Sequence, residues 1–227
     1  MEDGNQMNKL DVIYEDNHII VVRKPVNILS QKDNTNDIDM TTIVKSYLKK
    51  KYNKPGNVYL GLLHRLDRPV GGLMVLAKTS KAAKRLSEDI KLHKLKKTYI
   101  AVVEGIIKSD KGIMKDYLKR LPNGNVITTT NNDGKYAELE YKVLERNKKC
   151  NKTLVEINLK TGRHHQIRVQ FSSRGHALCG DQRYNKKDKT QIALFANKLS
   201  FIHPVKKVEM NFLIKPESSG YWTLFTL

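Results

Sequence analysis

The chain has 227 residues, of which 39% are hydrophobic and 29% charged, so it can bury a sizeable core and is too apolar to be disordered. Its 42 Lys and Arg outnumber its 23 Asp and Glu, and the net charge of +19 favours nucleic acid as a partner over a merely solvated lysine-rich surface. Two cysteines without a C-x-x-C motif, a polar N-terminus and no membrane-length apolar run predict a cytoplasmic protein with no membrane association.

Hydrophobic periodicity divides the first half of the chain into short strands and two helices. It predicts strands over 11–15, 18–23, 58–63 and 73–78, and helices over 41–52 and from Thr79-Ser80 to about residue 90. A polar loop is predicted between Ser30 and Asp39. The strands over 58–63 and 73–78 are expected to be buried, with Pro69 and the Gly71-Gly72 pair forming a loop between them.

Strands dominate the second half. The pattern predicts a strand over 99–103, a β-meander over 110–147 with turns at 122–124 and Asn132-Asp133-Gly134, and strands at 155–159, 192–202 and 207–214. A helix of about three turns is expected after Gly162, ending at Gly175. The predicted class is α+β, with a mixed, mostly antiparallel sheet and flanking helices, in a single domain over residues 1–227.

One acid stands out among these elements. Asp67 lies between Arg65 and Arg68 in the predicted loop between two buried strands, where a rigid scaffold would hold it at the edge of a core. A surface ion pair between Asp67 and a neighbouring arginine is the alternative interpretation. His64 is a candidate general base, although a structural histidine that satisfies the loop backbone is favoured.

A second polar stretch follows the predicted strand that ends near Leu159. On a helix there, His164 and Arg168 would share a face because they are four residues apart. Arg163 and Arg168 are candidate partners for phosphate or carboxylate groups. We predict no metal site at His164-His165, because adjacent helical histidines diverge by about 100° and no H-E-x-x-H motif is present.

Three segments then occur in an order that resembles the RluA family of RNA pseudouridine synthases. They are His64-Arg65-Leu66-Asp67-Arg68, Lys97-Thr98-Tyr99 and Thr161-Gly162-Arg163-His164-His165-Gln166-Ile167-Arg168. Gly175, Gly180-Asp181, Tyr184 and Phe201-Ile202-His203-Pro204 extend the resemblance, which runs from about Val12 to Leu213.

The resemblance implies a central catalytic cleft and isomerisation of a uridine in structured RNA, either rRNA or tRNA, without cofactor or metal. It implies that Asp67 is the nucleophile or base, that Tyr99 stacks on the uracil and takes a proton, and that Arg168 pairs with Asp67. It further implies that Arg65 helps to displace the target base. His64, Arg68, Arg163 and Lys97 are the further RNA-binding candidates. A monomer is expected, without the S4-like domain that some relatives carry before the catalytic domain.

The reaction explains these residue types. The N1–C1′ bond must break, the uracil must turn, and C5 must join C1′; a carboxylate can attack C1′ or take the C2′ proton, and both roles remain open. A nearby arginine keeps such an acid ionised in a dry pocket. Extruding the base costs a few kcal/mol, of which stacking on an aromatic ring returns about 1–3 kcal/mol.

The sequence departs from the family at Val70-Gly71-Gly72, where relatives usually have Thr-Ser-Gly, and a hydroxyl contact to RNA is expected to be lost. This departure motivates one alternative, a catalytically silent RNA-binding or ribosome-assembly protein with the same fold. A weaker alternative is a hydrolase that uses Asp67 and a second acid, Asp181, on a glycosidic bond.

Overall fold

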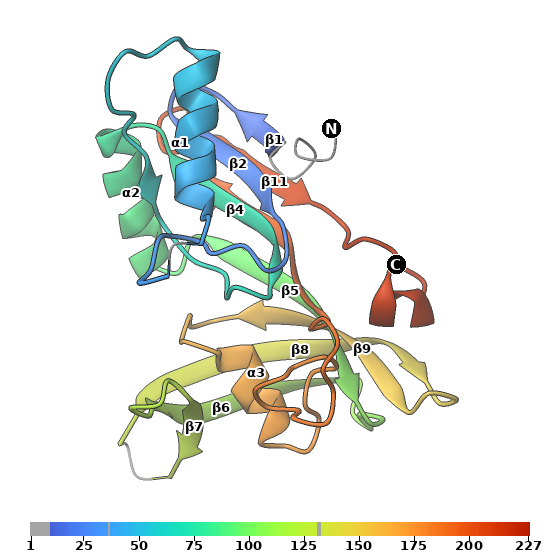
Figure 1. The fold of residues 1–227 in the computed structure, drawn as a ribbon. Coiled ribbons are helices and arrows are strands. Elements are labelled where there is room, and N and C mark those ends of the chain that lie inside the picture. The colour runs from blue at the N-terminus through green and yellow to red at the C-terminus, as the bar shows by residue number, and fades with distance from the viewer. Residues whose placement is uncertain (1–9, 36, 131–132) are drawn as a thin grey trace. The chain divides into compact units, whose positions relative to one another are not determined.

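A computed structural model describes residues 10–35, 37–130 and 133–227 of the chain (Figure 1). The chain divides into two compact units. Unit 1 contains Met1–Leu95 and Leu199–Phe212, and unit 2 contains Lys96–Lys198 and Leu213–Leu227. Each unit combines antiparallel strand pairs with helices of its own.

The strands of unit 1 are apolar and deeply buried. β1 (Asp11–Glu15) pairs antiparallel with β2 (Ile19–Lys24), β2 pairs with β4 (Gly71–Ala77), and the two-residue β3 (Gly61–Leu62) also pairs with β4. All seven residues of β4 are buried, as the continuous apolar run predicts. In the β2–β4 register Lys24 lies opposite Gly72, so the end of β2 meets the point where the Asp67 loop enters β4.

Two capped helices accompany these strands. α1 (Met40–Lys51) begins at Asp39, whose carboxylate accepts the N–H groups of Thr41 and Thr42 at 2.9 and 3.2 Å. α2 (Ser80–Lys91) begins at Thr79. Each helix buries one apolar face: Met40, Val44 and Leu48 in α1, and Ala82 and Leu86 in α2. β10 (Leu194–Ile202) and β11 (Glu209–Leu213) pair with each other late in the chain.

Unit 2 is built on five antiparallel strands in the order β5-β9-β8-β6-β7. Their bounds are β5 (Lys96–Glu104), β6 (Lys111–Arg120), β7 (Val126–Thr129), β8 (Lys135–Asn147) and β9 (Lys152–Leu159). β6 and β7 form a hairpin whose turn lies at 122–124, as predicted. The predicted meander is wrong in its strand order, because β8 pairs with β6 on the side away from β7. Asn132 of the second predicted turn lies outside the described residues.

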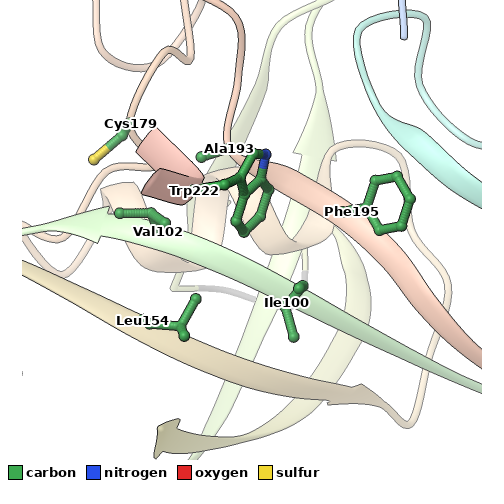
Figure 2. Packing of buried hydrophobic residues seen from close by; sticks show 7 residues of the cluster. All are labelled: Ile100, Val102, Leu154, Cys179, Ala193, Phe195 and Trp222. Atoms are coloured by element: carbon green, nitrogen blue, oxygen red, sulfur yellow. The ribbon is translucent and has the colours of Figure 1, made fainter. Parts of the chain in front are cut away.

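The C-terminal segment completes the core of unit 2. The 3-10 helix η1 (Gly220–Leu224) places Trp222 among six buried residues: Ile100, Val102, Leu154, Cys179, Ala193 and Phe195 (Figure 2). Trp222 is 9% exposed. A buried aromatic ring of this size contributes strongly to a core, so the last residues of the chain stabilise the strands of unit 2.

The structure confirms the α+β class and the mostly antiparallel strands, and besides the order of the meander it corrects three local predictions. The strand expected over 58–63 is reduced to Gly61–Leu62 and is half-buried. Gly71 and Gly72 begin β4 instead of lying in the loop, because glycine accepts the φ of +128° at Gly72 while the residue pairs with Lys24.

The helix expected after Gly162 is also shorter than predicted. α3 (Gln166–Ser172) has seven residues, or about two turns, and starts only after His165, whose φ of +53° is left-handed and cannot continue into a preceding helical turn. His164 therefore lies outside the helix and does not share a helical face with Arg168.

Candidate active site

Asp67 lies half-buried in the loop that leads into β4, in unit 1. Two contacts shape the loop around it. The Val70 N–H donates to the Asp67 carbonyl at 3.0 Å, which closes a turn over the intervening residues. The Ser30 hydroxyl accepts the Leu66 N–H at 3.0 Å and donates to the Leu66 carbonyl at 2.7 Å, so the residue before Asp67 is held on both backbone groups.

Lys24 holds the other side of the same loop. Its side chain is fully buried, and its Nζ donates to the carbonyl oxygens of Pro25 at 2.9 Å, Arg68 at 3.0 Å and Val70 at 2.8 Å. A buried ammonium has three donors, and here each one meets a carbonyl. Together with Ser30, Lys24 fixes the backbone immediately before and after Asp67.

Lys24 and Asp67 also interact electrostatically. Burial lowers the pKa of Lys24 from 10.5 to about 7, while the negative charge of Asp67 acts in the opposite direction and Arg68 lowers the pKa further. Lys24 was not among the residues that the sequence marked as functional. Its signal was a lysine directly at the end of an apolar strand and before a proline, in Ile-Ile-Val-Val-Arg-Lys-Pro.

The two arginines beside Asp67 are exposed. Arg68 forms an ion pair with Asp37 at 2.7 Å, and its Nε donates to the Asn27 carbonyl at 3.3 Å. Arg68 thus has an acid of its own in unit 1.

His64 is buried, and its Nε2 accepts the backbone N–H of Val75 at 3.1 Å. Val75 is in the middle of β4, so His64 connects the start of the Asp67 loop to the sheet. An Nε2 that accepts a hydrogen bond carries no proton of its own, which supports the structural interpretation of His64 over the general-base one.

Tyr99 and Lys97 lie on β5 in unit 2. Tyr99 is 6% exposed and lies opposite Ile157 of β9, in a well-formed part of the sheet. Burial lowers the pKa of the half-buried Lys97 below its usual range. A Cβ added at Gly162 would lie 3.6 Å from the Lys97 Nζ. The Lys97-Thr98-Tyr99 segment and the segment that starts at Thr161-Gly162 therefore lie next to each other at the Lys97 side chain.

Arg168 lies on α3 and is 5% exposed. Its Nε and Nη2 donate to the two carboxylate oxygens of Asp181 at 2.8 and 2.7 Å, which makes a bidentate ion pair inside unit 2. The predicted partner, Asp67, belongs to unit 1, and the pairing of Asp67 with Arg168 stays a prediction. Asp181 was noted in the sequence only as a family match and a possible second acid.

Arg163 is exposed and donates from Nε to the Tyr136 carbonyl at 2.8 Å. The rings of His164 and His165 stack with centroids 3.9 Å apart, whereas adjacent residues on a helix would point them apart. The left-handed backbone of His165 explains this difference. His165 is buried and its Nδ1 lies 2.9 Å from the hydroxyl oxygen of Tyr184.

The fold agrees with that of solved pseudouridine synthase structures. The structure of "Human RNA Pseudouridylate Synthase Domain Containing 4" superposes with a TM-score of 0.76 over 94% of this chain and 90% of that chain, at 21% identity. "Human RNA Pseudouridylate Synthase Domain Containing 1" gives a TM-score of 0.74 over 96% and 87%, also at 21% identity. At this identity the likeness concerns the fold.

Sequence comparison finds relatives that are more similar to this chain than the solved structures are. "Uncharacterized RNA pseudouridine synthase YhcT" of Bacillus subtilis is 32% identical over 88% of this chain and 66% of its own length. A relative described in the same words from Aquifex aeolicus is 33% identical over 92% and 70%. "Ribosomal large subunit pseudouridine synthase C" of Buchnera aphidicola is 34% identical over 86% and 63%.

The chain thus spans about two thirds of the length of these curated relatives. The family model described as RNA pseudouridylate synthase matches residues 18–173, which include the Asp67 loop, Tyr99 and Arg168. These matches confirm the predicted family, fold and isomerase class. The chain belongs to the RNA pseudouridylate synthase family.

Proposed function

We propose that this chain converts specific uridines of structured RNA into pseudouridine, with Asp67 as the catalytic nucleophile or base. The observation that carries the proposal is the Asp67 loop, in which Lys24 and Ser30 hold the backbone on both sides of a half-buried carboxylate. A reaction that depends on the position of one carboxylate needs such a rigid support.

In this proposal the carboxylate of Asp67 attacks C1′ or removes the C2′ proton, and the N1–C1′ bond breaks. In the first route the Asp67–C1′ bond breaks again when C5 joins C1′, and in the second route Asp67 returns the proton to C2′. The uracil then turns, a C5–C1′ bond forms, and the C5 proton is lost while N1 gains one, so that the product is an isomer of the substrate. Tyr99 stacks on the base and accepts a proton, and Arg168 stabilises the carboxylate. The proposed reaction uses neither a cofactor nor a metal.

The RNA-binding part of the proposal assigns phosphate contacts to the basic residues near these groups: Arg65, Arg68, Arg163 and Lys97. Arg65 and Arg68 are exposed, and Arg65 is assigned to displacing the base. The net charge of +19 supports sequence-independent attraction to the RNA backbone. RNA contact by His64 is the least supported assignment, because its ring is buried against β4.

The RNA substrate is proposed to be ribosomal, because a relative from Buchnera aphidicola and one from Blochmanniella floridana are named as ribosomal large subunit pseudouridine synthases. A tRNA stem-loop is the other candidate of the same class. A cytoplasmic location and a monomeric state stay predictions. Among the described residues, each helix is too short or too polar to cross a membrane.

The silent-protein alternative loses part of its motivation. Val70 is 2% exposed, and Gly71 and Gly72 are buried in β4 opposite the end of β2. The departure from the family pattern therefore lies at the point where the loop enters β4 and leaves the Asp67 carboxylate in its loop. The hydrolase alternative also loses support, since both oxygens of the buried Asp181 are bonded to Arg168.

The test is Asp67→Asn, measured by carbodiimide labelling and primer extension on rRNA and tRNA. Pseudouridine formation is expected to disappear while RNA affinity is retained, because the amide has nearly the same shape without the charge. Asp110→Asn is the matched control, since Asp110 is an exposed acid of unit 2 paired with Arg146. Full activity of Asp67→Asn would overturn the proposal, and release of free uracil would indicate a hydrolase.

A second measurement addresses the silent alternative. Pseudouridines are mapped in cells with and without the gene for this chain. Loss of one or a few sites identifies the substrate, whereas unchanged maps together with a ribosome-assembly defect would favour an RNA-binding protein without activity.

A further inference from the structure

Asp181 and Arg168 form a deeply buried ion pair in unit 2. Asp181 is fully buried and Arg168 is 5% exposed, and two charge-assisted hydrogen bonds of 2.8 and 2.7 Å join them. The contact uses the Nε–Nη2 edge of the guanidinium, which fixes both the position and the plane of the group. The orientation of Arg168 is thus set by a residue 13 positions further along the chain.

The carboxylate of Asp181 is itself rigidly placed. Its Oδ1 accepts the backbone N–H groups of Arg183 at 3.1 Å and Tyr184 at 3.2 Å, and its own N–H donates to the Leu178 carbonyl at 3.2 Å. Gly180, directly before it, has a φ of +73°, and a Cβ there would lie 2.2 Å from the Gln191 carbonyl oxygen. The turn that presents Asp181 therefore requires a glycine at this position.

Tyr184 holds the guanidinium from another side. Its ring centroid lies 5.3 Å from the Cζ of Arg168, within the range of a cation–π contact. The Tyr184 hydroxyl accepts the Val126 N–H at 3.0 Å and hydrogen-bonds to His165 at 2.9 Å. Arg168 is thus surrounded by groups that are themselves tied to β7 and to the start of α3.

We propose that Asp181 is a positioning residue of the isomerisation, acting through Arg168. The inference rests on the proposed function, in which Arg168 stabilises the catalytic carboxylate. A buried guanidinium that had to be oriented anew for each substrate would be costly to desolvate and slow to align. With Asp181 as a permanent counter-ion, the group is charged, desolvated and aligned before RNA arrives, and a guanidinium has enough donors for a second acceptor.

Asp181→Asn tests this role, because it removes the charge with little change in volume and sets an amide N–H₂ against guanidinium donors. The single-turnover rate at saturating RNA is expected to fall about 100-fold, as for a misplacement of about 1 Å. RNA affinity is expected to stay unchanged, since Asp181 is fully buried. If Asp181→Asn fails to fold, Asp181→Glu replaces it in the same experiment. This variant keeps the charge but moves it by one methylene, and it is also expected to lower the single-turnover rate.

Arg168→Met and the double variant Arg168→Met/Asp181→Asn separate positioning from other roles. If Asp181 acts only through Arg168, the double variant has the rate of Arg168→Met alone. The double variant should also unfold at a higher denaturant concentration than Arg168→Met, since it lacks the unpaired buried carboxylate. Losses of rate that multiply in the double variant would overturn the proposal.

Asp116→Asn is the matched control. Asp116 also holds the α3 region, because it accepts Gln170 of α3 at 2.7 Å and pairs at 2.9 Å with Arg174, which follows the helix. It is expected to lower stability and keep the rate of the folded protein. A wild-type rate for folded Asp181→Asn would overturn the inference alone. A wild-type rate for Arg168→Met would overturn both the inference and the role of Arg168 in the proposed function, and an inactive wild-type chain would overturn the function itself.

Discussion

The Nζ of Lys24 lies 3.0 Å from the carbonyl oxygen of Arg68, the residue directly after Asp67. A fully buried lysine thus supports the backbone of the candidate catalytic loop from within the core of unit 1. Burying an ammonium is costly, and three carbonyl partners offset that cost here. We therefore expect Lys24 to stabilise the conformation of the Asp67 loop more than the pairing of the strands.

Lys24→Met is predicted to destabilise unit 1 and to lower activity. The methionine fills a similar volume but leaves buried carbonyl oxygens of the loop without a donor, at about 1–3 kcal/mol for each group that water cannot reach. Urea unfolding gives the stability, and single-turnover pseudouridine formation gives the activity. Lys148→Met, at an exposed lysine between β8 and β9, is the control and should change neither. An unchanged rate in Lys24→Met would show that the loop holds its shape without the lysine.

Lys24 should also make stability depend on pH. Its pKa is about 7 in the folded protein and 10.5 in the reference state, so between these values the unfolded chain holds a proton that the folded protein has released. The free energy of unfolding then rises with pH, by up to about 1.4 kcal/mol per pH unit, and is flat below the folded pKa.

The measurement is the difference in unfolding free energy between wild type and Lys24→Met from about pH 6 to pH 9.5. This difference is expected to grow with pH, and a constant difference would contradict the lowered pKa. In an Asp67→Asn background the growth should begin at lower pH, because the charge of Asp67 acts to raise the pKa of Lys24.

Gly180→Ala and Gly175→Ala form a matched pair that tests the turn before Asp181. Both glycines have similar positive φ values, +73° and +77°, so the left-handed backbone should cost each variant about 1–2 kcal/mol. Gly180→Ala also places a Cβ 2.2 Å from the Gln191 carbonyl, whereas nothing lies within 4 Å at Gly175. This overlap should add about 1–3 kcal/mol. Equal losses of stability in thermal unfolding would contradict the packing at Gly180.

Tyr99→Phe separates stacking from proton transfer. The ring is retained, so RNA affinity should stay close to that of wild type, while loss of the hydroxyl should slow the proposed proton transfer by about 10²–10⁴-fold. Tyr99→Leu is expected to lose both affinity and rate. Equilibrium binding and single-turnover kinetics on the same RNA give the two quantities, and a wild-type rate in Tyr99→Phe would remove the hydroxyl from the mechanism.

Local patterns in the sequence were sufficient for much of the fold. The apolar run of β4, the N-cap at Thr79 and the turn between β6 and β7 depend on neighbouring residues, so their positions could be predicted. The helix after Gly162 was predicted too long, because periodicity does not reveal the left-handed φ of His165. The start of β4 was predicted as a loop, because two glycines normally interrupt a strand.

The sequence by itself determined the family and the identity of the candidate catalytic groups, because Asp67, Tyr99 and Arg168 lie in short contiguous motifs. Only the tertiary structure decided what supports them. Lys24 lies 44 residues from Arg68 and Ser30 lies 36 residues from Leu66, and Asp181 meets Arg168 across a turn. Such partners are selected by burial, since a charged or polar group removed from water must find its counterpart wherever the folded chain brings one.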